Sequence, residues 1–560
     1  MTRPYLRKQG DILVTTAERS WVTILFAIVM LTVFSISFYA IRTSTDEWWH
    51  LRTGQYIVEH HSLPQHDIYD YTTLDMPWVN HEWLSQVIFY LVYDSVGIKG
   101  FILFKSLIIV AAFAILFCAV YKRSNNPYIA LFVTMIAALA SRHTLYPRPP
   151  IFSYLLMASY LYLLYSITEK VDRKIPWWQI ALFPILMIFW VNLHGGAILG
   201  IILVGCFLVG SLISKINSKI LKSPAQVDKT KLLVIILILV LLASLVNPYG
   251  YKVFKLSVDV MKDRALVESI GELKSPDFHY THFYEILILL MIIGFAWSLN
   301  AVTITDIILI FFFLHQSLNY VRHLPLFGIV AAPIIGKHLA LSWQHLWSRG
   351  RIALPDAGNK GEVTSHLPAE EPSDIMADLA PTNHTKRYAW NKIIVSGLII
   401  LAFFYVLFIE GQLSLNMETI NGSGYRKHDY PVYASDFILA NDFTGNMFNE
   451  INSSGYLMWR LYPKHLLFTD NRFDIFGSKF LKDFYAVTEV WDNWQQVLDK
   501  YKINYFIISK DSMLDRALAK TAGWVKVYYD YGYVIYVKDI PENKELIDRC
   551  NKTFAYWTTG

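Results

Sequence analysis

The sequence has few charged residues and almost no cysteine. Only 17% of its 560 residues are Asp, Glu, Lys or Arg, whereas a soluble protein carries about a quarter. The three cysteines, Cys118, Cys206 and Cys550, are too few and too scattered for a disulfide framework or a CxxC zinc knot. The formal charge is +5, and no basic block indicates a nucleic-acid partner. These shortages exclude a disulfide-stabilised domain and give no support to nucleic-acid binding.

Apolar residues make up 54% of the chain, and they fall in runs long enough to cross a bilayer, about twenty residues each. We therefore expect a mainly α, polytopic membrane protein with about eleven transmembrane helices. The predicted spans are 20–41, 100–121, 127–143, 150–168, 177–193, 196–215, 231–248, 284–299, 303–318, 324–341 and 391–410. The stretch 83–97 is apolar but short, so it could be a twelfth span or a helix at the interface.

The distribution of Lys and Arg favours eleven spans. If 83–97 does not cross, the inner loops collect most of the basic residues, as expected of cytoplasmic loops. Residues 1–19 and a linker at 346–390 then lie in the cytoplasm, and residues 411–560 lie outside a multi-pass plasma membrane protein. The short outer turns keep only three arginines, Arg142, Arg148 and Arg322.

The domain boundaries follow from this topology. A transmembrane domain at 20–345 has large outer loops at 42–99 and 249–283, and the Pro- and charge-rich linker 346–390 is too polar to fold around a core. After the last span, 391–410, short β-rich runs alternate with helical patterns, which predicts a soluble α/β domain at 411–560. Its "TDNRFD" segment (469–474) could hold a ligand, but we favour a structural ion pair of Asp470 with Arg472. We expect this domain to recognise an acceptor or to dock on the membrane domain.

Polar clusters gather at the outer ends of the predicted spans: "DEWWH" (46–50), "SRHTLYPRPP" (141–150), "NLHGG" (192–196), "NPYGYKVF" (247–254) and "NYVRHLPLF" (319–327). Each could be interfacial decoration, with tryptophans in an aromatic belt and arginines reaching lipid phosphates. Ionisable groups near a membrane more often line a cavity or pair with one another. The spacing after Asp46 predicts a surface-lying helix over 46–61, with Trp48 and Trp49 at headgroup depth and Asp46 in its first turn.

These residues carry a resemblance to a known superfamily. A carboxylate just after the first span, followed by "DEWWHLRTGQYIVEHHSLPQHDIYDYT…PWVNHEWLSQ", resembles the GT-C membrane glycosyltransferases and, more narrowly, a bacterial group with a D-x-W-W-H-L motif. The similarity extends to "NPYG", "ELKSPDFH" (272–279) and "SSGYLMWRLYP…LLFTDNRFDIF" (453–476). The chain departs from the better-known mannosyl- and aminoarabinosyl-transferases in lacking the Arg that often follows the carboxylate. The resemblance implies a polyprenyl-phosphate-linked sugar as donor.

Such a reaction needs a base for the acceptor hydroxyl and cations for the departing phosphate. Asp46 is the first candidate for the base and Glu47 the second. Arginine offers phosphate a bidentate fork, so the three outer arginines are candidate clamps. The candidate substrate-binding residues are His50, Arg142, His143, Arg148, His194, Arg322 and His323. No cofactor is expected; a divalent metal on Asp46, Glu47 and His50 is conceivable but not favoured.

The sequence thus predicts a membrane glycosyltransferase that transfers a sugar from a polyprenyl-phosphate donor to a lipid or envelope-glycan acceptor at the outer face, surrounded by membrane lipids. The loop 249–283 is long enough to be a lid over the site, or else an amphipathic surface helix. The alternative is a non-enzymatic transporter, flippase or assembly factor for lipid-linked saccharides. A transporter should show internal repeats, and none is evident.

Overall fold

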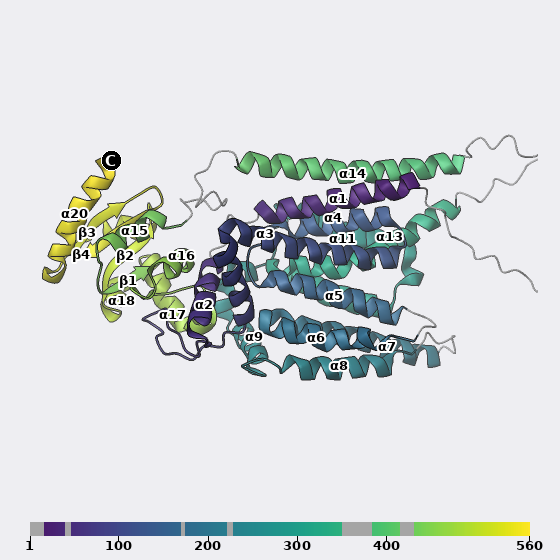
Figure 1. Cartoon of the computed structure of the whole chain (residues 1–560), viewed down its shortest axis with the longest axis horizontal. Helices are drawn as coiled ribbons and strands as arrows, with labels where there is room; N and C mark the ends of the chain where they lie inside the picture. The colour runs from purple at the N-terminus through teal and green to yellow at the C-terminus, as the bar shows by residue number, and fades with distance from the viewer. Residues whose placement is uncertain are drawn as a thin grey trace, which may run out of the picture.

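The structure, a computed structural model, describes residues 16–39, 46–169, 174–220, 228–349, 383–414 and 430–559. A long bundle of apolar helices forms one part of the molecule, and a smaller α/β domain caps one end of it (Figure 1). The expected fold class, a mainly α polytopic membrane protein with a C-terminal α/β domain, is confirmed.

Each of the eleven predicted spans coincides with an apolar helix in the described part of the chain. Six helical segments are long and apolar enough to cross a membrane by length and composition, and four shorter apolar helices accompany them; the number of spans itself stays a prediction. The helices are α1 (Thr16–Tyr39), α3 (Trp83–Ser124), α4 (Pro127–Ser141), α5 (Pro150–Thr168), α6 (Trp177–Leu193), α7 (Ile198–Ile220), α8 (Thr230–Ser244), α11 (His282–Ser298), α12 (Ile304–Asn319), α13 (Leu324–Arg349) and α14 (Asn383–Ser414).

The ambiguous stretch 83–97 is the first arm of α3. The helix breaks at Gly97, whose φ of 67° lies in the left-handed region that glycine adopts without strain. The arm before the break packs on the short helix α2 (Asp46–His60). At Gly54 the two helices approach so closely that a Cβ would lie 2.1 Å from the backbone oxygen of Gln86. The arm is thus held at the end of the bundle where α2 lies.

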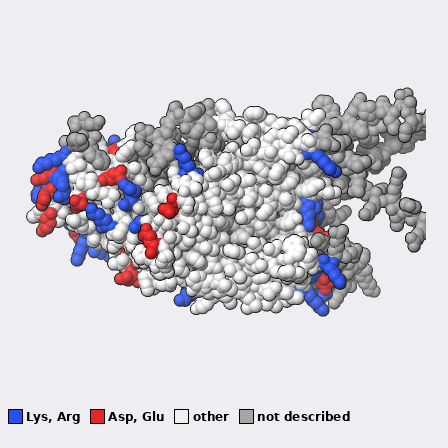
Figure 2. Space-filling model, in the orientation of Figure 1, with Lys and Arg blue, Asp and Glu red and all other residues white. Residues whose placement is uncertain are grey.

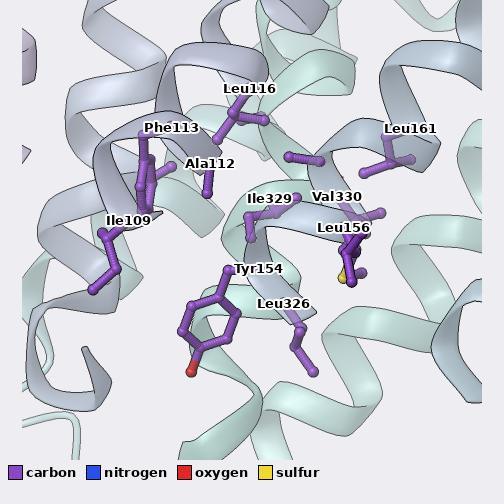
Figure 3. Packing of buried hydrophobic residues seen from close by; sticks show 14 of the residues in the cluster. Ile109, Ala112, Phe113, Leu116, Tyr154, Leu156, Leu161, Leu326, Ile329 and Val330 are labelled. Carbon is purple, nitrogen blue, oxygen red and sulfur yellow. The ribbon is translucent and has the colours of Figure 1, made fainter. Parts of the chain in front are cut away.

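The bundle is centred on α5 and α13. In the most apolar stretch of each of these helices, 78% and 83% of the residues are buried inside the protein. Side chains from α3, α5 and α13 interdigitate there (Figure 3). Because lipid is as apolar as these side chains, close van der Waals packing must supply most of the association energy. The labelled contacts come from Ile109, Phe113, Leu116, Tyr154, Leu156, Leu161, Leu326, Ile329 and Val330.

The C-terminal domain has one four-stranded sheet in the order β1-β2-β4-β3. Strands β1 and β2 are parallel and the other pairs are antiparallel, so the sheet is partly parallel, as the alternation of strand-like and helical runs favours. Alternate residues of β2 enter separate cores on the two faces, Tyr505 and Ile507 on one and Phe506 and Ile508 on the other. The elements are α15 (Val432–Ala440), β1 (Asn446–Asn449), α16 (Ile451–Leu461), α17 (Phe473–Thr488), α18 (Trp494–Lys500), β2 (Ile503–Ser509), α19 (Met513–Leu518), β3 (Trp524–Tyr529), β4 (Tyr533–Lys538) and α20 (Lys544–Thr559).

Helix α2 forms as the spacing predicts, but it is not a surface helix. It lies between the bundle and the C-terminal domain (Figure 1) and packs on α16. Trp48 is 2% exposed, with its ring against Tyr430 and Tyr456, and Trp49 is 8% exposed in the core of the C-terminal domain. The expectation that both tryptophans anchor at headgroup depth is therefore wrong. The periodicity of the sequence predicts the helix, but it does not predict that the C-terminal domain covers it.

The loop between α2 and α3 (residues 61–82) is joined to the C-terminal domain by a buried ion cluster, here called the Arg472 knot (Arg472, Asp67, Asp70 and Asp470). The Arg472 guanidinium bonds Asp470 (2.6 Å), Asp67 (2.6 Å) and Asp70 (2.7 Å). The predicted ion pair with Asp470 is confirmed. The β-rich run 465–471, for which the sequence favours a strand, does not join the sheet, since Leu467 makes only an isolated parallel bridge to Asp70.

On the face shown in Figure 2, charged side chains gather at the two ends of the molecule, and a wide band between them is almost free of charge. Lys and Arg lie at the end of the bundle remote from the C-terminal domain, where α3 ends and α8 begins. The predicted linker falls largely on residues 350–382, which lie outside the described residues, so its disorder stays a prediction.

Candidate functional site

Asp46 begins α2 and meets two other segments. Its carboxylate accepts a hydrogen bond from Arg148 Nη1 (2.7 Å) and another from Asn471 Nδ2 (2.6 Å). The second terminal nitrogen of Arg148 bonds Glu272, which lies in the 3-10 turn η3 (Gly271–Leu273) of the loop 249–283. Arg148 precedes α5, and Asn471 belongs to the C-terminal domain. Four segments far apart in sequence therefore meet at one carboxylate and one guanidinium.

These charges remain partly open to solvent: the side chains of Asp46, Arg148 and Glu272 are 22%, 19% and 36% exposed. Burial alone would lower the pKa of Arg148, but Glu272 and Asp46 outweigh it and raise that pKa above its usual range. Arg148 is thus a permanent cation whose charge is shared by two carboxylates.

A second carboxylate, Glu82, lies close by, directly before α3. Three imidazole Nε2 atoms face it, from His194 (3.5 Å), His50 (3.8 Å) and His81 (3.8 Å). His50 comes from α2, His81 from the outer loop and His194 from the end of α6. The structure thus brings the predicted residues His50 and His194 together around a carboxylate that sequence reasoning did not list.

Burial dominates the acid–base properties of this group. It raises the pKa of Glu82 above its ordinary value, and the charge of Asp46 adds to that shift. It lowers the pKa of His50 and of His194 well below the ordinary value, and the charges of Arg148 and Arg322 act in the same direction. Both histidines are therefore neutral at physiological pH.

Arg322 lies in the 3-10 turn η5 (Val321–His323), and its charge acts on both Glu82 and His194. Within the described ranges, no hydrogen bond or ion pair engages its guanidinium. His323 packs beside Tyr320, and its Nδ1 is buried with no hydrogen-bond partner in the structure. Of Arg142, Arg148 and Arg322, Arg322 is the one that lies near Glu82 and His194 with no carboxylate bonded to it in the described residues.

The side chains of Arg142 and His143 do not reach Asp46 or Glu82. They lie in η1 (Arg142–Thr144), where Arg142 Nε bonds His143 Nε2 (2.9 Å) and the guanidinium lies over the Phe283 ring of α11 (5.4 Å). Glu47 also points away from Asp46: it is fully buried, and its carboxylate accepts a hydrogen bond from Tyr430 (3.1 Å). The structure does not bring these three residues to the cluster around Asp46 and Glu82.

Asp46, Glu47 and His50 point to different partners and do not form a common ligand set. Among the residues that the structure describes, no group of three or more His, Cys, Asp or Glu side chains could hold a metal ion.

Sequence reasoning missed Glu82, His81, Glu272 and Asn471. Glu82 and His81 stand in the "NHEWL" part of the motif that carries the superfamily resemblance, so the motif was a usable signal. Glu272 and Asn471 stand in "ELKSPDFH" and "TDNRFD", but nothing in the sequence shows that these two segments meet Asp46.

No protein-family model and no curated protein matches this sequence. Solved structures do. The archaeal oligosaccharyltransferase AglB from Archaeoglobus fulgidus, in complex with an inhibitory peptide and a dolichol-phosphate, is 11% identical with a TM-score of 0.54, covering 96% of this chain and 78% of its own. ArnT from Cupriavidus metallidurans in the apo state is 13% identical with a TM-score of 0.51, covering 94% of this chain and 99% of its own. The chain therefore has a GT-C-like fold.

Proposed function

We propose that this chain is a membrane glycosyltransferase that transfers a sugar from a polyprenyl-phosphate donor to a cell-envelope acceptor at the outer face. The observation that carries the proposal is the cluster of carboxylates and cations at one end of the bundle. Charged groups are costly near a membrane unless they are used or paired. Here Arg148 is paired with two carboxylates. In the described residues no hydrogen bond engages the Arg322 guanidinium or the Glu82 carboxylate; three imidazoles lie 3.5–3.8 Å from Glu82, and the charge of Arg322 acts on it.

Arg322 is the first candidate to bind the donor phosphate. Its free guanidinium can offer two parallel N–H donors to phosphate oxygens, which Arg148 cannot do without releasing a carboxylate. Neutral His194 and His50 can add hydrogen bonds to phosphate or sugar oxygens. Arg142 could join only after leaving Phe283, and His143 is bonded to Arg142, so we assign them a secondary role.

The acceptor would enter between the bundle and the C-terminal domain. That domain supplies Asn471 directly to Asp46, and the loop 249–283 supplies Glu272 to Arg148. This arrangement supports the idea that the loop covers the site. A lipid or envelope glycan bound at the junction would touch both parts of the protein.

The basic residues at the opposite end of the bundle support a cytoplasmic location for that end and an external site. In a variant whose three native cysteines are replaced, single cysteines at Lys215 and Tyr531 test this orientation. An impermeant thiol reagent applied to intact cells should label only the Tyr531→Cys variant. Labelling of the Lys215→Cys variant alone would refute the external site.

The function itself is tested with membranes that contain the chain and a panel of radiolabelled polyprenyl-phosphate sugars. We expect transfer of label to a lipid or envelope fraction from one donor, and little transfer in the Asp46→Asn variant. Glu59→Gln, an exposed substitution on the same helix, is the matched control. Movement of intact labelled lipid across sealed vesicles, without transfer, would instead support the transporter alternative.

A further inference from the structure

Glu82 is the carboxylate of the site with the most unusual surroundings. It stands at the N-cap position of α3 without a side-chain capping hydrogen bond, and its side chain is 13% exposed. Three imidazoles from three different segments aim their Nε2 atoms at it. A structural carboxylate in such a place would normally be bonded to a cation or to backbone N–H groups.

The distances show that these imidazoles surround Glu82 without binding it. The separations of 3.5 to 3.8 Å exceed the 2.7–3.2 Å of an N–H···O hydrogen bond. No other described residue donates a hydrogen bond to this carboxylate. Asp46 differs, because each of its two oxygens already accepts one hydrogen bond. Glu82 therefore keeps its lone pairs available for an incoming proton.

The hydrogen bonds of His194 fix which of its nitrogens carries the proton. The backbone N–H of Gly196 can only donate, and it lies 3.1 Å from His194 Nδ1. Because Nδ1 accepts from Gly196 it carries no proton, so the Ser153 hydroxyl, which accepts from Trp190 Nε1 (2.7 Å), donates to the same Nδ1 (2.7 Å). In neutral His194 the ring proton must then sit on Nε2, the atom that faces Glu82. The Nε2–H of His194 therefore faces Glu82 at 3.5 Å, where a small approach would let it donate to the ionised carboxylate.

The surrounding charges are mixed, so no single cation holds Glu82 ionised. Burial raises its pKa; His81 and Arg322 favour ionisation, while Asp46 and Asp474 oppose it. The titratable and charged groups that face Glu82 are His50 and Asp46 on α2, His81 on the outer loop, His194 after α6, Arg322 on η5 and Asp474 on α17. Such a carboxylate is a stronger base than an ordinary exposed one.

We propose that Glu82 is the proton acceptor of this site and that Asp46 positions Arg148. This proposal rests on the proposed function. In the step, the acceptor hydroxyl gives its proton to the Glu82 carboxylate, and its oxygen forms a bond to the anomeric carbon of the donor. The bond between that carbon and the phosphate oxygen breaks, and the polyprenyl phosphate leaves with the electron pair. His50, His81 and His194 keep the carboxylate facing the acceptor.

The first test compares Glu82→Gln, Glu82→Asp and Asp46→Asn in the transfer assay, with Glu59→Gln as control. Loss of a positioned base should lower kcat of Glu82→Gln by about a hundredfold to ten-thousandfold with little change in KM. In the parent, activity should fall as pH decreases through the raised pKa of Glu82. That acidic limb should disappear in Glu82→Gln, persist in Asp46→Asn, and return with partial activity in Glu82→Asp. An acidic limb that persists in Glu82→Gln would overturn the proposal.

A second test needs no substrate. Infrared spectra of the full chain in nanodiscs, parent minus Glu82→Gln, should show one carboxyl band that titrates above the ordinary glutamate range. Absence of such a band, or a stoichiometric metal ion that is lost in Glu82→Gln, would overturn the assignment because the lone pairs would then be engaged. A titrating band together with no transfer from any donor would instead overturn the proposed glycosyltransferase function and leave the basic carboxylate in place.

Discussion

The Arg472 knot and the Arg148 cluster (Arg148, Asp46 and Glu272) are both built from one guanidinium and several carboxylates. They differ in how completely these groups are shielded from solvent. In the knot, the charged side chains are at most 1% exposed, and the guanidinium lies over the rings of Tyr69 (5.0 Å) and Trp78 (4.5 Å). In the cluster, Asp46, Arg148 and Glu272 are 19% to 36% exposed. An enclosed ion group can fasten two parts of a chain together, whereas a partly open one can exchange its partners with a ligand.

Asn471 connects the two regions. It stands between Asp470 and Arg472 of the knot, and its side chain reaches Asp46 of the cluster. The backbone N–H of Arg472 also bonds Asp470 (2.7 Å), so the knot fixes the turn that carries Asn471. A fastener between the outer loop and the C-terminal domain therefore also sets the geometry of the site.

The largest effect is expected from removing the cation of the knot. Arg472→Met would leave Asp67, Asp70 and Asp470 buried without their shared partner, which typically costs about 3–5 kcal/mol. We expect the C-terminal domain to undock, with faster proteolysis, a lower unfolding temperature and no transfer. Arg460→Met, which breaks an exposed ion pair in the same domain, is the control. A variant as resistant to protease as the parent would show that the knot is not a fastener.

Much of this comparison was accessible from sequence, because apolar runs and local spacing act over short distances. They predict the eleven apolar helices, the helix that begins at Asp46, and the pair of Asp470 with Arg472. The association of Asp67 and Asp70 with Arg472 joins residues some four hundred positions apart, and no local pattern encodes it. The burial of Trp48 and Trp49 was missed for the same reason.

The candidate site was predicted in part. Asp46, His50, Arg148, His194 and Arg322 come together because each lies at the same end of a neighbouring helix. Arg142, His143 and Glu47 satisfy the same depth criterion, yet their side chains point to other partners. Depth along a helix can be read from sequence, but the direction of a side chain depends on packing that appears only in the fold.

The second prediction concerns Asp46. Replacement by Asn removes the charge that holds Arg148, and the new amide N–H₂ must compete with the donors of Arg148 and Asn471. A misplaced cation near the reacting atoms should lower kcat/KM by about a hundredfold, while folding should change little because the side chain is partly exposed. Transfer kinetics and the unfolding temperature check both statements. Full activity in Asp46→Asn would remove Arg148 and Asp46 from the mechanism.

The third prediction separates the arginines. Arg322→Lys keeps the charge but loses the bidentate fork, so the KM for the donor should rise roughly tenfold, and Arg322→Ala should raise it further. Arg142→Ala should have the smaller effect because its guanidinium faces Phe283. Arg264→Ala, on an exposed ion pair of the loop 249–283, is the control. Equal donor KM values across these variants would refute the phosphate role of Arg322.

The smallest effect is expected from Asp70→Asn in the knot. Burial raises the pKa of Asp70 well above its ordinary value, and the neighbouring Asp470 and Asp67 add to that shift. A carboxyl whose pKa is higher in the folded chain stabilises the fold at low pH, and this contribution is lost as pH rises from about 3.9 toward the folded value.

The Asn side chain of the Asp70→Asn variant has the same shape as Asp and carries no charge. The loss of folding stability with rising pH that Asp70 causes should therefore disappear in the variant. At neutral pH the variant no longer has to bury a carboxylate beside Asp67 and Asp470, and this gain offsets the lost attraction to Arg472. We therefore expect the free energy of unfolding to change by no more than about 1 kcal/mol. The measurement is the unfolding temperature of parent and variant from acidic to neutral pH. The dependence of the unfolding temperature on pH should differ between the two proteins more than its value at neutral pH does. A strongly destabilised Asp70→Asn variant at neutral pH would mean that Asp70 is ionised in the knot and acts as a full partner of Arg472.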